Sequence, residues 1–381
     1  MLRPSINWLI IFLPIAVILE VGHLNHAPWA SPTLIFLASA LAIIPIAGWM
    51  GHATEHLAAR LGEGIGGLLN ATFGNAAELI IAFMALLTAV REPEQRALMH
   101  GIVKASLTGS IIGNVLLVLG IALLAGGLRF QAQRFNPVGT RVNATLLTLA
   151  AIALLIPGLF SQVVSPLSPT VEALSLELSV VLLVVYALSL VFSLKTHRHL
   201  YVGDESAEEG AEHHEHWSVR RALGVLVLAT VGVGVLAELM VGSVHAAAAS
   251  LGWTDLFVGV VVVAIVGNAA EHSTAVLVAM RNRMDLALTI AIGSSIQIAL
   301  FAAPLLVLVS YALGAPMDLN FTVAEIVAVG VAVITVEQIA SDGESHWLEG
   351  VLLLTVYVML GVLFFHLPAT PESGASLPVH P

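Results

Sequence analysis

Long apolar runs, separated by short polar stretches, follow one another along nearly the whole chain. A helix needs about 20 mostly apolar residues to cross the hydrocarbon core of a membrane, and the pattern predicts eleven such spans. They lie near residues 6–24, 31–59, 64–90, 97–127, 140–160, 171–194, 221–248, 255–280, 285–313, 321–340 and 348–367. We therefore predict an all-α polytopic membrane protein.

Composition supports this prediction and removes several classes of function. Hydrophobic residues make up 58% of the chain and charged residues only 10%, which is typical of a protein built for lipid. The chain has no cysteine, so disulfides and thiolate metal sites are excluded. The first apolar run is interpreted as a helix, because no convincing small-residue cleavage site follows it. The net charge of −11 gives no support for nucleic-acid binding.

The basic residues predict the orientation, because Lys and Arg favour the cytoplasmic side of a membrane. With the N-terminus in the cytoplasm, eleven basic residues fall inside and only Arg91 and Arg96 fall outside, while Lys104 lies within the fourth span. The eleven are Arg3, Arg60, Arg129, Arg134, Arg141, Lys195, Arg198, Arg220, Arg221, Arg281 and Arg283. Compact loops and a short N-terminus favour the plasma (inner) membrane of a bacterium.

A polar stretch at residues 195–217 divides the chain and is predicted to be an acidic cytoplasmic linker. Before it lie an N-terminal transmembrane helix (1–30) and a five-helix repeat (31–194). After it lie a second five-helix repeat (218–367) and a flexible C-terminal tail (368–381). Because each repeat has an odd number of spans, the second is inverted relative to the first, as in many secondary transporters.

The string Gly-Asn-Ala-Ala-Glu occurs once in each repeat, at residues 74–78 and 267–271. Two further pairs support the match between repeats. Glu55 precedes the first copy as Glu238 precedes the second, and Gly-Ser occurs at residues 109–110 and 293–294. An ionised glutamate at the depth of a membrane costs roughly 2.5 kcal/mol or more, so two in matched positions indicate function.

The motif predicts an oxygen-lined cation site. Asn75 and Glu78 are three residues apart, as are Asn268 and Glu271, so each pair shares a face of its helix. A helix break at the glycine would free backbone carbonyls, which are tolerated at this depth where they line a cavity. Two inverted copies brought together offer carboxylate, amide and carbonyl oxygens, the ligands that Ca²⁺ prefers. We expect Glu78 and Glu271 to bind this cation.

Charge neutrality predicts the mechanism. Two ionised glutamates with nothing between them are unfavourable in a low dielectric, and either Ca²⁺ or protons can neutralise them. Competition of this kind is antiport. It gives two protons for each Ca²⁺ if only Glu78 and Glu271 titrate, and more if Glu55 and Glu238 also take part.

Four segments resemble a known family. They read IGGLLNATFGNAAELI at residues 65–80, GNAAEHST at 267–274, GSSIQIALF at 293–301 and SDGESHWLEG at 341–350. The chain is similar over about residues 31–367 to the Ca²⁺/H⁺ exchangers, the cation/proton branch of the cation/calcium exchanger superfamily.

This resemblance implies a first helix, two inverted five-helix repeats and alternating access at a central site. It implies that Glu78 and Glu271 bind the cation and compete for protons, with Asn75 and Asn268 beside them. It further implies residues on the access path to this site. These are Glu55 and Glu238 on long gating helices, and Ser110 and Gln297 facing the cavity.

Histidines leave alternatives open. His272 follows the second motif and either relays protons or makes a hydrogen bond between helices. His52 and His56 flank Glu55 with the spacing of a zinc pair, but no third ligand is evident. The linker contains Glu-His-His-Glu-His at residues 212–216, which is either a regulatory metal site or, as we prefer, a solvated acidic loop.

The leading prediction is a Ca²⁺/H⁺ antiporter that exports Ca²⁺ from the cytoplasm. The runner-up is a related exchanger that uses Na⁺ or K⁺. A channel fits inverted repeats less well. An enzyme is disfavoured because the chain has no His-Glu-x-x-His motif. The expected partners are membrane lipid and the transported Ca²⁺ and H⁺, with no cofactor. The sequence does not choose between a monomer and a homo-oligomer.

Overall fold

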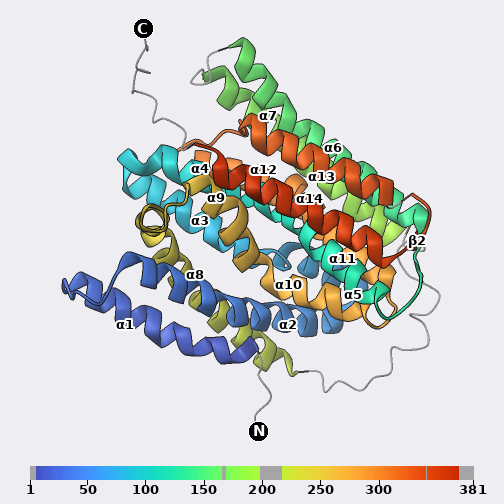
Figure 1. Ribbon diagram of the computed structural model, residues 1–381, viewed down its shortest axis with the longest axis horizontal. Helices are drawn as coiled ribbons and strands as arrows, with labels where there is room; N and C mark the ends of the chain where they lie inside the picture. The colour runs from blue at the N-terminus through green and yellow to red at the C-terminus, as the bar shows by residue number, and fades with distance from the viewer. Residues whose placement is uncertain (1–5, 165–168, 198–216, 340, 369–381) are drawn as a thin grey trace.

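The computed structural model describes residues 6–164, 169–197, 217–339 and 341–368. The predicted linker at 195–217 therefore lies outside the described residues except at its two ends. The same holds for the predicted tail beyond residue 368. The described chain is almost entirely helical (Figure 1).

The first half contains seven α-helices with shorter 3₁₀ and π segments between them. In chain order they are η1 (Ile6–Ile11), α1 (Phe12–Leu24), α2 (Pro32–Phe73), α3 (Ala76–Arg91), η2 (Pro93–Gln95), α4 (Arg96–Ile112), η3 (Gly113–Val118), α5 (Leu119–Gly127), α6 (Pro137–Val163), α7 (Pro169–Val191) and η4 (Phe192–Thr196). Of the short segments, η1 and η2 are 3₁₀-helices, while η3 and η4 are π-helical.

The second half has the same character. Its elements are α8 (Val219–Leu251), α9 (Asp255–Phe257), η7 (Val258–Val263), α10 (Ala264–Ala279), α11 (Met284–Gln297), η8 (Ile298–Ala302), α12 (Ala303–Ala312), α13 (Val323–Ile339) and α14 (Trp347–His366). Both η7 and η8 are π-helical. Two short strands, β1 (Gln133–Arg134) and β2 (Glu344–Ser345), pair antiparallel and join the two halves.

Eight helical segments in the described residues are long and apolar enough to cross a membrane, and a ninth joins them if a bent pair counts as one span. That pair covers 255–269 and 271–279 and bends by 68°. The two remaining predicted spans correspond to α3, with 16 residues, and α13, with 17. The chain is thus a multi-pass membrane protein, and the exact count of eleven stays a prediction.

The long helix α2 is not straight. A Cβ placed on Gly66 would lie 2.3 Å from the carbonyl oxygen of Ala58, although eight residues of straight helix are about 12 Å long. The chain therefore turns sharply between these residues, and the candidate span ends at Leu61. The continuous helical segment thus contains the predicted end of one span near residue 59 and the start of the next.

Local sequence sets the ends of several helices. Ser218 accepts a hydrogen bond from the backbone N–H of Arg221 and caps the start of α8. Gly252 ends the same helix with a left-handed backbone (φ 69°), which glycine adopts at low cost. Asn136 caps α6 in the same way as Ser218 caps α8. Ser218 and Gly252 thus mark the two ends of α8, which is one helix of 33 residues.

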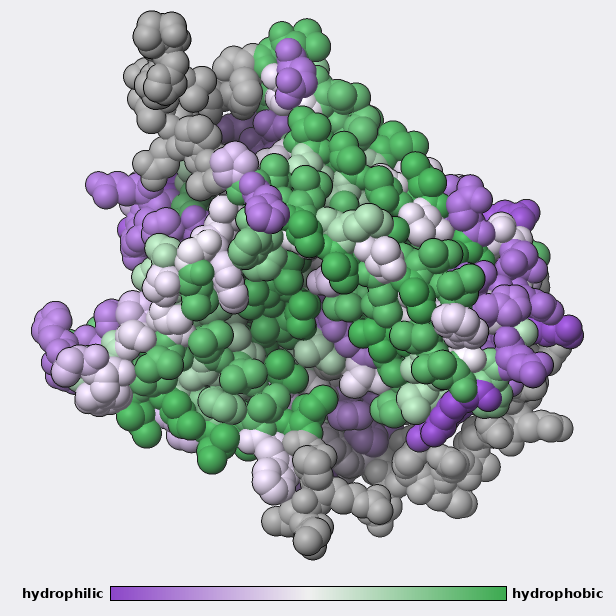
Figure 2. Space-filling view, in the orientation of Figure 1, coloured by the Kyte–Doolittle hydropathy of each residue, from purple (hydrophilic) through white to green (hydrophobic). Residues whose placement is uncertain are grey.

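The helices form layers. Figure 1 shows α1, α2 and α8 together along one side of the bundle, while α6, α7, α13 and α14 lie along the opposite side. The helices α3, α4, α10 and α11 lie between them. Figure 2 shows a broad apolar surface across the bundle with hydrophilic residues concentrated toward its ends, as expected for a protein surrounded by lipid.

The loops gather at two ends as the sequence predicts. At one end β1 pairs with β2, Arg129 donates to the carbonyl of Met280, and Arg141 donates to the carbonyl of Ser341. At the other end Thr33 and Ser250 share a hydrogen bond. The arginine-rich loops therefore share one end of the molecule, and the connections predicted for the opposite side meet at the other.

The closest helix crossing joins the two repeats. A Cβ on Gly109 in α4 would lie 2.0 Å from the carbonyl oxygen of Val260 in η7. On the other side of the crossing, a Cβ on Gly259 would lie 2.5 Å from that of Ala105. The backbones touch because neither glycine carries a side chain. This crossing holds α4, which carries Ser110, against the segment that leads into the second motif.

Candidate functional site

Both Gly-Asn-Ala-Ala-Glu strings lie at interruptions of a membrane helix. Between α2 and α3 the helix breaks at Gly74 and Asn75, so that Glu78 sits in the first turn of α3. In the second repeat the helix bends by 68° between residues 269 and 271. The positive end of the α3 dipole favours the charge of the Glu78 carboxylate. The first interruption lies at the predicted glycine, whereas in the second repeat the bend follows Gly267 and α10 stays helical across it.

The two motifs are in direct contact. A Cβ on Gly267 would lie 2.9 Å from Cγ of Glu78. Glu78 of the first repeat thus packs on the backbone of the second motif, and only glycine leaves room for it. The expectation that the inverted copies meet at one point agrees with this contact.

Asn75 is held by the opposite repeat. Its side chain is 3% exposed and donates a hydrogen bond of 2.7 Å from Nδ2 to Oε1 of Gln297. This bond turns the amide nitrogen toward α11 and leaves Oδ1 facing elsewhere. Gln297, predicted to face the cavity, therefore lies beside the first motif.

Asn268 is held by three groups. Its Nδ2 donates to Oγ of Ser110 at 2.8 Å and to the carbonyl of Ala264 at 2.9 Å. Its Oδ1 accepts from Nδ2 of Asn114 at 3.1 Å. Both polar groups of Asn268 are thus occupied, unlike those of Asn75. Ser110 was predicted near the site, whereas Asn114 was not, although it lies one turn further along the same helical segment.

Five buried side-chain oxygens have no hydrogen-bond partner among the described residues, and three of them belong to the two motifs: Oδ1 of Asn75, Oε1 of Glu78 and Oε2 of Glu271. Buried polar atoms are almost always paired, so a group of orphaned atoms calls for a reason. All three belong to the predicted site, and they come from both repeats. The Glu271 carboxylate also interacts with the side chain of Ser294. Ser294 entered the sequence-based prediction only through the Gly-Ser pair that matches the two repeats. A hard cation or protons would satisfy these oxygens.

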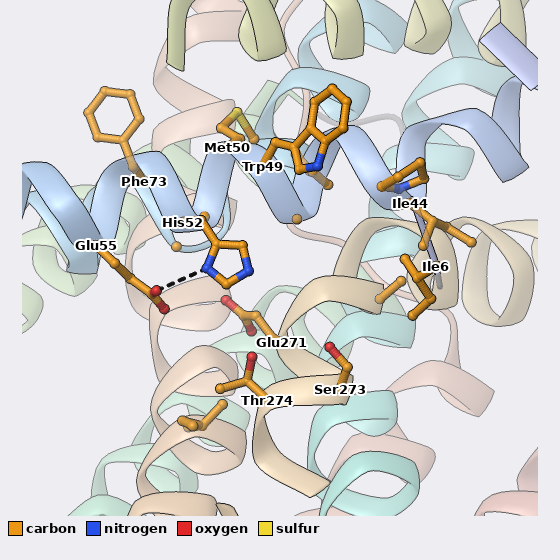
Figure 3. Close-up of a pocket in the computed structure, with 18 of the residues that line it drawn as sticks. Ile6, Ile44, Trp49, Met50, His52, Glu55, Phe73, Glu271, Ser273 and Thr274 are labelled. Atoms are coloured by element: carbon orange, nitrogen blue, oxygen red, sulfur yellow. Dashed lines mark ion pairs between the residues drawn. The ribbon is translucent and has the colours of Figure 1, made fainter. Parts of the chain in front are cut away.

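A cavity of about 850 Å³ reaches this site from one end of the bundle. Glu271 lines it, with Ser273 and Thr274 on the same helix (Figure 3). Trp217 and Arg221, at the start of α8, line its outer part. Glu78 is not among the described lining residues, so the two glutamates differ in their access to this cavity.

The two predicted gating glutamates have different surroundings. Glu55 lines the cavity, and its Oε2 lies 3.4 Å from Nδ1 of His52 (Figure 3). Glu238 forms an ion pair with Arg91, with 2.8 Å between Oε1 and Nη1. The structure therefore brings Glu55 to the route toward the site, whereas Glu238 lies outside this cavity.

The histidines do not form a metal site in the described part of the chain, where no group of three metal-binding side chains occurs. His52 contacts Glu55, while His56 stacks on Trp217 with 4.7 Å between ring centroids. Nε2 of His272 is buried without a partner among the described residues, so this nitrogen makes no interhelical hydrogen bond there. The acidic histidine cluster at residues 212–216 lies outside the described residues.

Both repeats carry a π-helical turn after the Gly-Ser pair. In the first repeat η3 begins at Gly113, just after α4, and in the second η8 begins at Ile298, just after Gln297. Such turns are frequent at functional sites because they re-aim side chains within a helix. Asn114 lies within η3, and this position turns its amide toward Asn268.

Comparison with known proteins gives a consistent result. The family described as "Sodium/calcium exchanger protein" matches residues 31–195 and 221–366. A "Ca(2+)/H(+) antiporter" from Aphanothece halophytica is 45% identical over 381 residues, covering 96% of this chain and 97% of that protein. One of the same name from Synechocystis sp. is 47% identical over 372 residues, covering 94% and 98%.

The fold is also similar to solved structures. The structure of native YfkE superposes with a TM-score of 0.79 at 39% identity, covering 95% of this chain and 100% of that one. YfkE is described as a Ca²⁺/H⁺ antiporter protein in a related structure. The similarity extends over both repeats and the site between them.

Proposed function

The chain belongs to the sodium/calcium exchanger protein family, and from this premise we propose that it is a secondary active Ca²⁺/H⁺ antiporter. The observation that carries the proposal is the group of three buried, unpaired oxygens of Asn75, Glu78 and Glu271, drawn from both repeats. Relatives at 45% and 47% identity bear the name Ca²⁺/H⁺ antiporter. Ca²⁺ is the cargo here, and we assign no enzymatic reaction to the chain.

The proposed mechanism follows from charge. Glu78 and Glu271 carry two negative charges when ionised, which one Ca²⁺ or two protons neutralise. A neutral site crosses between the two open states at lower electrostatic cost than an empty, doubly charged one. Binding of Ca²⁺ therefore releases protons on one side of the membrane. After Ca²⁺ leaves on the other side, the site must bind protons there before the protein returns to its first open state. This cycle supports exchange of two protons for each Ca²⁺.

The side that the cavity faces supports an orientation. The arginine-rich loops lie at the end of the bundle where α8 begins, and Arg221 at that start lines the cavity. By the preference of basic residues for the cytoplasm, we infer that this end is inside, with the N-terminus in the cytoplasm. The structure then corresponds to an inward-open state, ready to take up cytoplasmic Ca²⁺ for export across a bacterial plasma membrane.

The experiment that tests the function uses purified protein in proteoliposomes. An imposed pH gradient should drive uptake of radioactive Ca²⁺, and collapsing the gradient with a protonophore should stop it. Uptake driven by a Na⁺ or K⁺ gradient, and indifferent to pH, would instead support an exchanger coupled to those ions. Their oxygen preferences overlap with those of Ca²⁺, so this arm is the decisive comparison.

We predict that Gly267→Ala weakens Ca²⁺ binding. The added methyl group would lie 2.9 Å from Cγ of Glu78 and displace its carboxylate. Overpacking of this kind costs roughly 1–3 kcal/mol, which corresponds to a roughly 5- to 150-fold rise in the Ca²⁺ concentration for half-maximal uptake. Gly330→Ala is the control, because a Cβ there meets nothing within 4 Å. Equal Ca²⁺ dependence in both variants would contradict the contact.

The two asparagines should behave differently. Asn75→Ala removes an unpaired oxygen and one hydrogen bond, to Gln297 in the cavity lining, so we expect weaker Ca²⁺ uptake with a smaller change in melting temperature than for Asn268→Ala. Asn268→Ala leaves Asn114 and Ser110 without their buried partner, at a cost of roughly 1–3 kcal/mol. That variant should melt several degrees lower. The measurements are the Ca²⁺ concentration for half-maximal uptake and thermal unfolding in detergent. Weaker uptake in Asn268→Ala together with a lower melting temperature in Asn75→Ala would show that Asn268, and not Asn75, binds the cation.

A further inference from the structure

An ion pair links the end of α3 to the middle of α8. Arg91 is the last residue of α3, and its guanidinium lies 2.8 Å from the Glu238 carboxylate. The first turn of the same helix carries Glu78. Thirteen residues of helix span about 20 Å, so one rigid segment connects the cation site to this ion pair.

The ion pair lies away from the open route. The cavity is lined by Trp217 and Arg221, near the first residue of α8. Glu238 lies 17 residues beyond Arg221, about 25 Å further along the same helix. Neither Arg91 nor Glu238 lines the cavity in the described part of the chain. The pair therefore joins α3 to α8 away from the residues that line this cavity.

The matching acid on the open side has a different partner. Glu55 of the first repeat corresponds to Glu238 of the second, and it contacts His52 within the cavity lining. Arginines at the corresponding end of α10, at positions 281 and 283, make no ion pair with Glu55 in the described residues. An arginine-paired glutamate thus accompanies the closed side, and a glutamate without such a pair accompanies the open side.

We propose that Arg91 is a gating residue, whose ion pair with Glu238 holds α3 against α8 and keeps the route opposite the cavity closed. This proposal rests on the alternating-access function proposed above. Opening of that route requires α3 and α8 to separate, which breaks the pair. Both side chains are half exposed, at 61% and 52%. Exposed pairs stabilise a state only modestly, by a factor on the order of two to five in population. A transporter needs no more, because its two states must interconvert.

The test measures which side is open, independently of transport. The chain has no cysteine, so Thr274→Cys provides a single reporter in the cavity lining, between Glu271 and the end of α10. The full-length protein is reacted with a membrane-impermeant maleimide without Ca²⁺, and the labelling rate is followed. Adding Arg91→Gln should slow labelling, because the cavity is open for less of the time, and the effect should reach roughly two- to fivefold where the inward-open state is the minor one.

Further variants separate the ion pair from local damage. Glu238→Gln should slow labelling to the same extent, and the charge exchange Arg91→Glu with Glu238→Arg should restore the rate. Arg96→Gln is the matched control, since this arginine at the same end hydrogen-bonds to the carbonyl of Ala89. High salt should slow the parent and leave Arg91→Gln unchanged. Unchanged labelling in Arg91→Gln, or no recovery in the exchanged pair, overturns the proposal.

Labelling distinguishes this inference from the proposed function. The reporter reads conformation without any ion flux, so proton coupling could be wrong while the labelling pattern still appears. Conversely, proton-driven uptake in the parent together with unchanged labelling in Arg91→Gln would support the antiporter function and rule out the gating role of Arg91.

Discussion

Glu271→Gln and Glu78→Gln are each expected to abolish Ca²⁺ uptake driven by a pH gradient. Each change keeps the size of the side chain but leaves one carboxylate to balance a divalent cation at a buried site. Leaving a buried charge without its partner costs roughly 3–5 kcal/mol, which corresponds to a roughly 150- to 4,000-fold loss. The measurement is the initial rate of Ca²⁺ uptake into proteoliposomes at saturating pH gradient.

Glu337→Gln provides the control, because it removes an exposed carboxylate from α13. It should transport at the parental rate. Gel filtration and thermal unfolding must show that the two site variants remain folded. Normal uptake by either folded site variant would mean that its carboxylate does not bind the cation, and the site would have to be sought elsewhere along the cavity.

The second large effect is expected from Gly109→Ala. The methyl group would lie 2.0 Å from the carbonyl oxygen of Val260, where the backbones of α4 and η7 touch. Backbone cannot move aside as a flexible side chain does, so the crossing must open, at a cost of about 3 kcal/mol or more. We expect a melting temperature lower by several degrees. Transport should also fall by at least about tenfold, because Ser110, the next residue, holds Asn268.

Gly101→Ala tests the same chemistry on the same helix. Gly101 is exposed, and a Cβ there meets nothing within 4 Å. Alanine is favoured over glycine in a helix by about 1 kcal/mol, so this variant should unfold at the same or a slightly higher temperature. If Gly109→Ala were as stable and as active as Gly101→Ala, the close crossing of the two repeats would be absent in solution.

Much of the fold could be predicted from the apolar pattern, because a membrane helix must be apolar over its full length. Nine of the predicted spans coincide with candidate spans, including the bent pair around residue 270. The other two, α3 and α13, are shorter helices. The pairing of the two motifs was also predictable, since their identity over five residues and the odd number of spans in each repeat leave few other arrangements.

What could not be predicted depends on how one repeat sits on the other. Asn114 carries no signal in a single sequence, and only the π turn of η3 brings its amide to Asn268. The partner of Glu238 was similarly hidden, because Arg91 lies 147 residues earlier. From the sequence, Arg91 served only to predict the orientation of the chain in the membrane. Periodicity reports which face of a helix is buried but not which helix covers it.

The bonds across the site bear on how such a chain arose. Asn75 is held by Gln297, Asn268 by Ser110 and Asn114, and Glu78 rests on Gly267, so each motif is completed by residues of the other repeat. One repeat alone makes none of these contacts. A protein of only five such helices would therefore complete this site only by pairing with a second copy inserted in the opposite direction.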